Sequence, residues 1–435
     1  MFGAERSAWI VLAFSSYGGA APVVRGTNAA AHDRCRFDTP SPILRTMRFP
    51  HLPTASLAAL ALAGSSFAQS QPAVIVRIEN LAPDAGTFLT PLWVGFQDGS
   101  FDLYDTGALA SALPFAGSFA LERMAEDGDL ATLITDFATL QPGGPQGVIR
   151  SNGAMPPIAP GASVARLFQV DPSVDRYFSY ASMVLPSNDA FIANANPKAS
   201  ELFNAQGAFV GNSFVVSGTQ VRDAGTEVND ELPATTAFFG QQTPDTGVAT
   251  SDPIAVHPGF AAPNQGGILA DPMFANADFT QPGYELLRVS FTEVDRGGFF
   301  QFGGILDASQ EVAATPVSSA GVGTTLVRLD GASNQLQVVA AIANLTGPIT
   351  VAHLHVGRAG ENGPVVLDLT PFIVPNGNGG TIQSRFLAAA LTGPFANEAD
   401  AFGALLAEAA TGGIYLNVHT AQNPGGEVRA QLRTF

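Results

Sequence analysis

Short apolar segments recur along this chain, and turns that contain Gly or Pro separate them. Examples are residues 74–78, 92–96, 177–185, 336–342 and 414–419. Many short runs at regular spacing are typical of β-strands in a sandwich or a barrel. The 46 Gly and 31 Pro fit a chain with many turns better than one with long helices. We therefore predict an all-β protein.

One stretch, residues 115–140, departs from this pattern. Leu121, Met124, Leu130, Leu133 and Phe137 follow helical spacing there, and Asp127-Gly128-Asp129 interrupts it. This spacing predicts two short helices. The predicted fold is therefore two β-sandwich-type domains with a few short helices, preceded by a signal peptide.

The signal peptide is predicted at residues 47–68. Arg48 gives it a basic start, residues 57–63 form an apolar centre, and Ser66-Phe67-Ala68 places small residues before a cleavage site at Gln69. Residues 1–46 are interpreted as a disordered extension from a misassigned start, with a long atypical leader as the alternative. We expect a secreted, periplasmic or surface-held product without a transmembrane segment, because no apolar run reaches the length of a membrane span.

The mature chain is predicted to divide near residues 295–298, with one domain at 73–297 and another at 299–435. The formal net charge of −17 makes nucleic acid an unfavourable partner, because phosphate binding needs a basic surface. The only cysteine, Cys35, precedes the predicted cleavage site. We therefore expect neither disulfides nor thiol chemistry.

Two segments of the first domain, 178–191 and 221–231, place carboxylates just after predicted strands. Asp189, Asp223 and Glu227 are the candidates for a calcium site, since calcium prefers several oxygen ligands from loops. Gly225 allows the second loop to turn back onto one ion. The alternative is that these are solvated turn residues, with Asp189 capping a short helix.

The stretch from Tyr180 to Asp189, with Asp-Ala-Gly-Thr-Glu at 223–227 and His257-Pro258-Gly259-Phe260, resembles the spondin amino-terminal domain in its bacterial form. The resemblance covers about residues 74–295. It implies a β-sandwich that holds calcium through Asp189, Asp223 and Glu227. The third position is Asp in animal members, and Ala190 and Arg222 stand where those members commonly have Trp.

Three histidines of the second domain form another candidate site. His353 and His355 alternate along one predicted strand and so share a face, and His419 shares a face with Asn417 on another strand. Three convergent imidazoles can bind zinc or copper. The alternative is a structural hydrogen-bond cluster in which the histidines pair with Glu427 or Asn417.

The motif Ala-His-Leu-His-Val-Gly at 352–357, the strand Tyr-Leu-Asn-Val-His-Thr at 415–420 and the closing Gly-Gly-Glu-Val-Arg-Ala-Gln-Leu at 425–432 resemble the CHRD domain, named from chordin. Gln310-Glu311-Val312 also fits. The resemblance covers about residues 299–435. It implies a β-rich extracellular module without established catalysis.

The sequence has no Gly-x-Ser-x-Gly elbow, no Walker loop and no His-Glu-x-x-His motif. We therefore expect a non-enzymatic, calcium-binding adhesion or extracellular-matrix-type protein. Its expected partner is an extracellular protein, a polysaccharide or a cell-surface ligand. The alternative is a metal-dependent exported enzyme that uses the histidine cluster of the C-terminal domain.

Overall fold

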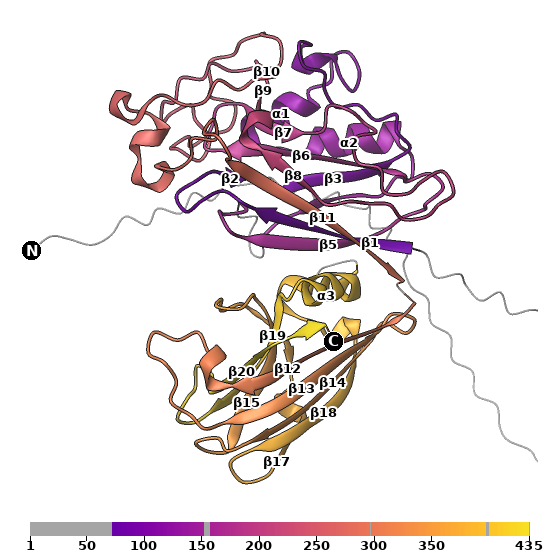
Figure 1. Ribbon diagram of the computed structural model, residues 1–435, viewed down its shortest axis with the longest axis vertical. Helices are drawn as coiled ribbons and strands as arrows, with labels where there is room; N and C mark the ends of the chain where they lie inside the picture. Colours follow the sequence, from indigo (N-terminus) through magenta and orange to yellow (C-terminus); the bar gives the residue numbers. More distant parts are fainter. Residues whose placement is uncertain (1–71, 152–156, 296, 397–399, 435) are drawn as a thin grey trace, which may run out of the picture. The chain divides into compact units, whose positions relative to one another are not determined.

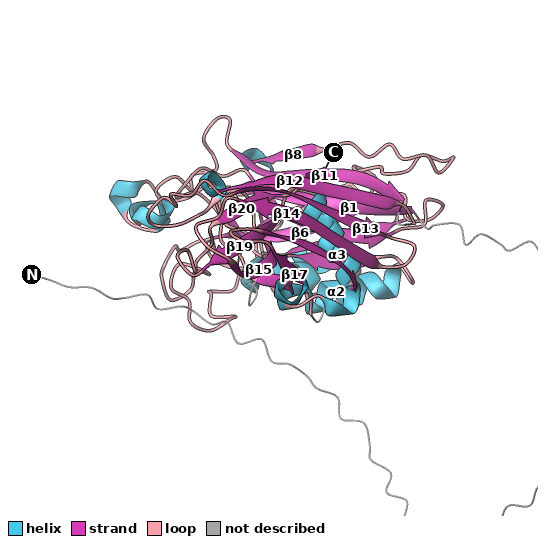
Figure 2. Ribbon diagram, turned by 90° about the horizontal axis from the view of Figure 1, so that it is seen from below, coloured by secondary structure: helices cyan, strands magenta, loops and turns pink. Residues whose placement is uncertain are grey.

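The computed structural model describes residues 72–151, 157–295, 297–396 and 400–434. The predicted signal peptide and residues 1–46 lie outside the described residues. Strands dominate the described chain, which confirms the all-β prediction (Figure 1; Figure 2). Among the described residues, no helix is long and apolar enough to cross a membrane.

Residues 72–295 form two antiparallel sheets. The first sheet has the order β5 (Ser163–Gln169), β1 (Pro72–Asn80), β11 (Glu285–Asp295), β8 (Phe214–Ser217). The second has the order β10 (Ala255–Val256), β9 (Arg222–Asp223), β7 (Ala190–Ala193), β6 (Tyr177–Leu185), β3 (Leu92–Gln97), β4 (Gln146–Ile149), and β2 (Phe88–Leu89) pairs with β6.

The two sheets share one core, which makes this part a sandwich. Val76 and Val289 of the first sheet belong to the same buried cluster as Val94 and Phe178 of the second. Because side chains alternate along a strand, Trp93 points to the opposite face of the second sheet.

That opposite face carries two helices, α1 (Ala120–Asp127) and α2 (Ala131–Leu140). The rings of Trp93 and Phe137 lie there with centroids 5.1 Å apart. Gly128 ends α1 in the left-handed conformation, with φ of 66°, and its N–H donates to the carbonyls of Arg123 and Met124. The prediction of two short helices broken at this glycine is confirmed.

Residues 299–434 form a ten-stranded antiparallel sheet. Its order is β16 (Val365–Asp368), β15 (Ile349–Val356), β19 (Ile414–Thr420), β20 (Val428–Gln431), β12 (Phe299–Asp307), β13 (Val322–Asp330), β14 (Gln335–Ala343), β18 (Gly380–Leu387), β17 (Ile373–Pro375), and β21 (Arg433–Thr434) pairs with β12. Every strand ladder of the described residues lies wholly before or wholly after residue 296.

This sheet curls around a buried core. Leu354 of β15 and Val338 of β14 lie far apart in the strand order but belong to one buried cluster. Phe402 and Leu405 of a third helix, α3 (Ala401–Ala410), join the same cluster. Since alternate residues of β15 face this core, His353 and His355 face outward from it.

Candidate metal centre

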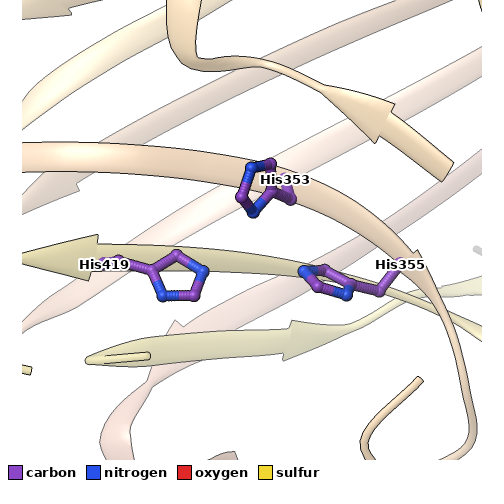
Figure 3. Close-up of side chains that lie close together, drawn as sticks. All are labelled: His353, His355 and His419. Atoms are coloured by element: carbon purple, nitrogen blue, oxygen red, sulfur yellow. The ribbon is translucent and has the colours of Figure 1, made fainter. Parts of the chain in front are cut away.

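His353, His355 and His419 converge on the outer face of the curled sheet. β15 and β19 are neighbours, and their register places His353 opposite Asn417 and His355 opposite Tyr415. The ring centroid of His353 lies 5.5 Å from that of His355 and 5.5 Å from that of His419. One nitrogen from each ring lies within 4.8 Å of the other two, and Figure 3 shows the rings gathered around a common space.

Hydrogen bonds fix the tautomers of two of these rings. Nδ1 of His355 lies 2.9 Å from the carbonyl oxygen of Gly363, and Nδ1 of His419 lies 3.0 Å from that of Pro424. A carbonyl only accepts, so each Nδ1 carries the proton and donates it. The lone pair of each neutral ring is then on Nε2, and both Nε2 atoms are buried without a protein partner. Backbone carbonyls orient metal-binding histidines in the same way.

The surroundings of the three imidazoles favour their neutral form. Burial lowers the pKa of His353 and His419, and it lowers the pKa of His355 to about 4. The neighbouring histidines and Arg429 also oppose protonation of His355. His353 lies opposite Asp368 of β16, with Nε2 3.8 Å from Oδ1. Neutral imidazole is the form that binds a metal ion.

A stack of side chains supports the ring of His355. Tyr415 is parallel to it, and the guanidinium of Arg429 lies 3.5 Å from the centre of the Tyr415 ring. Arg429 is 1% exposed. It donates to the carbonyls of Glu361 and Arg358 and to the side chain of Gln431.

Glu427 does not pair with the triad. Its buried carboxylate accepts hydrogen bonds from Ser319, Thr346, Thr420 and Asn423. Asn417 donates to Glu311. The pairings expected for a purely structural histidine cluster, to Glu427 or Asn417, are therefore not formed among the described residues.

The acidic residues of the first domain lie in a different setting. Asp189 is fully buried, and its Oδ2 accepts from the backbone N–H groups of Thr226 and Glu227, at 2.8 and 3.1 Å. Its Oδ1 has no protein partner. Burial and the charge of Asp223 raise the pKa of Asp189 to about 6. The residue precedes strand β7, so the alternative role as a helix cap is wrong.

Asp223 and Glu227 do not occupy equivalent positions. Asp223 belongs to strand β9, and its two oxygens accept from Gly225 N and Asn229 Nδ2, at 2.8 and 2.6 Å. Glu227 is buried, and burial together with the charge of Glu126 raises its pKa to about 8. Burial raises the pKa of Glu126 itself to about 7.

The structure therefore adds Glu126 of α1 to this acidic cluster. Sequence reasoning missed it, because the residue lies about a hundred positions from Glu227 and belongs to an ordinary amphipathic helix. In the part of the chain that the structure describes, the histidine triad is the one group of three or more His, Cys, Asp or Glu with mutual ligand-atom distances within 4.8 Å. Asp189, Asp223 and Glu227 do not form such a group.

A curled antiparallel sheet with three imidazoles on its outer face defines residues 299–434 as a β-domain with a candidate transition-metal site. Residues 302–432 match the family model of the CHRD domain, a domain typical of extracellular proteins. The chain matches no curated protein and no solved structure. The CHRD match does not reach residues 72–295, whose resemblance to the spondin domain stays a prediction.

Proposed function

We propose that this is an exported binding protein whose CHRD-type domain holds a zinc or copper ion through His353, His355 and His419. The observation that carries the proposal is the convergence of three neutral imidazoles, two of which present a buried Nε2 without a protein partner. Leaving such buried nitrogens unpaired costs about 1–3 kcal/mol each. A bound metal ion removes that cost, because it takes both lone pairs at once.

Metal analysis of the purified, exported protein tests this proposal. We expect about one zinc or copper ion per chain in the wild type and its loss in His355→Ala and His419→Ala. His257→Asn is the matched control, because His257 is a buried histidine outside the triad whose Nδ1 accepts from Gly259 N. An Asn side chain can accept the same bond. Stoichiometric metal that persists in the triad variants would overturn the proposal.

A second candidate function is calcium binding in the first domain, as expected of an adhesion or matrix protein. It is favoured by Oδ1 of Asp189, a fully buried carboxylate oxygen without a protein partner beside Asp223 and Glu227. Calcium would cancel the repulsion in this cluster and stabilise the fold by mass action.

Thermal unfolding with and without calcium tests this second function. Asp189→Asn should lose the calcium-dependent rise in melting temperature. Asp223→Asn should lose less of it, since both oxygens of Asp223 already accept hydrogen bonds. An equal calcium response in wild type and Asp189→Asn would refute the site.

A cavity of about 660 Å³ beside strands β8 and β9 supports a polysaccharide as the partner. Its lining includes Tyr104, Tyr180, Asn194, Asn212 and Arg222. Tyr104 and Tyr180 are almost completely buried. The amide groups of Asn194 and Asn212 and the guanidinium of Arg222 are therefore the groups that match the hydroxyl-bearing surface of a sugar. Binding of the protein to immobilised polysaccharides, compared with an Arg222→Ala variant, tests this partner class. Equal retention of both proteins would argue against it.

A further inference from the structure

Unpartnered polar atoms gather beside the histidine triad. The described residues contain nine buried side-chain nitrogen or oxygen atoms without a protein hydrogen-bond partner. Four of them are Nε2 of His355, Nε2 of His419, Oδ1 of Asn417 and Oε1 of Glu311. A metal ion accounts for the two imidazole nitrogens. It leaves the two oxygens unexplained, because Glu311 is not among the residues whose ligand atoms meet within 4.8 Å.

Asn417 is a neighbour of the triad in the sheet. It is directly opposite His353 in the β15–β19 register, and it is two residues from His419 on the same face of β19. Its side chain is almost completely buried, with 3% exposed. Oδ1 of Asn417 is therefore a buried acceptor without a protein partner on a residue next to the histidines in the sheet.

Glu311 is tied to this position. Its Oε2 accepts from Nδ2 of Asn417 at 3.3 Å. The preceding residue, Gln310, anchors the segment, because its Oε1 accepts from Gln431 N and its Nε2 donates to the carbonyl of Ile305. The carboxyl group is thus held beside Asn417 by the chain on which it lies.

Within the described residues, no cationic side chain donates a hydrogen bond to either of these two oxygens. Arg429 is the nearby positive charge, and its hydrogen bonds go to two backbone carbonyls and to Gln431. Two orphaned acceptors beside a metal position call for a small group with two polarised protons. A water molecule bound to a metal ion is such a group.

We propose that the fourth ligand of the metal is a water molecule that donates hydrogen bonds to Oδ1 of Asn417 and Oε1 of Glu311. The inference rests on the proposed metal site. Three protein ligands plus a water are the arrangement of open zinc sites, in which the water exchanges with external ligands. The water should therefore exchange with a small anion such as azide, against the repulsion of Glu311.

Azide binding to the cobalt-loaded, exported protein tests the inference. Cobalt(II) replaces zinc with visible absorption bands that change when a ligand exchanges. We expect azide to shift these bands and to saturate. Asn417→Ala should tighten azide binding about tenfold, because the competing water loses an acceptor. Glu311→Gln keeps an acceptor oxygen but removes a negative charge that repels the anion, so it should also tighten azide binding about tenfold.

Glu293→Gln is the matched control, since Glu293 is an exposed carboxylate of β11, outside the triad's domain, and should leave azide affinity unchanged. Circular dichroism verifies that each variant is folded. If cobalt binds through the triad but azide leaves its spectrum unchanged, the fourth-ligand inference is wrong and the metal site stands. Azide affinities that are equal in all four proteins would also overturn the inference. If no cobalt binds, the proposed function fails as well.

Discussion

The phenol ring of Tyr415 is stacked on the imidazole of His355, with centroids 4.7 Å apart and planes 8° from parallel. The stack holds the imidazole plane, while the bond from Nδ1 to Gly363 sets its rotation. The hydroxyl of Tyr415 accepts from the N–H of that same glycine at 3.1 Å. Tyr415 therefore positions His355, one of the three candidate ligands.

Two substitutions of Tyr415 should separate the contribution of its ring from that of its hydroxyl group. We expect Tyr415→Leu to weaken metal affinity about tenfold, as loss of an orienting partner usually does. Tyr415→Phe keeps the stack and should stay within about threefold of wild type. Competition with a chromophoric chelator measures both values. Equal affinities of the Leu and Phe variants would show that the stack does not position the imidazole.

Glu427 should make stability depend on pH in the acid range. Burial alone would raise its pKa, but hydrogen bonds from Ser319, Thr346 and Thr420 outweigh burial and lower it to about 2, from 4.5. The stabilisation is therefore present above pH 4.5 and is lost as pH falls toward 2. Glu427→Gln should lower the free energy of unfolding at pH 7 by about 3 kcal/mol. Urea unfolding at pH 7 and pH 3 should show a smaller difference between wild type and variant at pH 3.

Glu126 and Glu227 should make stability depend on pH in the opposite direction to Glu427. Burial is the first cause of both shifts, and it raises their pKa values from 4.5 to about 7 and about 8. Ionisation is then less favourable in the folded state, so stability should fall as pH rises from about 4.5 to 8. In the presence of a chelator, Glu227→Gln should raise the melting temperature at pH 8 by about 5 °C. No such gain is expected for Glu293→Gln, and a matching gain there would contradict the assignment.

Stability should depend on the glycine at position 128, where α1 ends. A Cβ atom at this position would lie 2.7 Å from Cγ2 of Thr90, and φ is +66°. Gly117 has φ of +85° and open space around the same added atom. Gly117→Ala should cost only the backbone term of about 1 kcal/mol, and Gly128→Ala should cost clearly more. Chemical denaturation compares the two variants, and equal losses would mean that Thr90 moves aside freely.

We predict that the protein is exported with cleavage before Gln69. Mass spectrometry of the exported protein should find its amino terminus at or near that residue. The proposed metal site depends on no residue before this point. An intact segment 1–46 in the exported product would contradict the predicted start and cleavage.

The strands were predictable where alternation or a continuous apolar run was strong. Residues 177–185 form β6 as predicted, and His353 and His355 share the face that period-two geometry assigns them. Helix α3 was missed, because its run of Ala and Leu is apolar on nearly every side and carries no helical stripe. Strands β9 and β10 are two residues each, too short to show any period.

Some residues of the candidate sites were also predictable from the sequence, and others were not. The three histidines were predictable, because two lie on one strand and the third lies on a strand of similar pattern. The role of Glu311 was not, since the turn that brings it to Asn417 leaves no periodic signal. Asp223 and Glu227 were expected to act together, but Asn229 and Gly225 occupy the oxygens of Asp223 while Glu227 lies near Glu126. Sequence spacing does not reveal such local competition for hydrogen bonds.

The triad joins β15 to β19, and His355 and His419 are 64 positions apart in the chain. An ion held there would be a cross-link between distant segments of a chain whose single cysteine cannot form an internal disulfide. At a free metal concentration one hundred times the dissociation constant, such a link stabilises the folded state by about 2.7 kcal/mol. Unlike a disulfide, this cross-link would depend on the concentration of metal around the protein, so the stability of the domain would follow the composition of its surroundings.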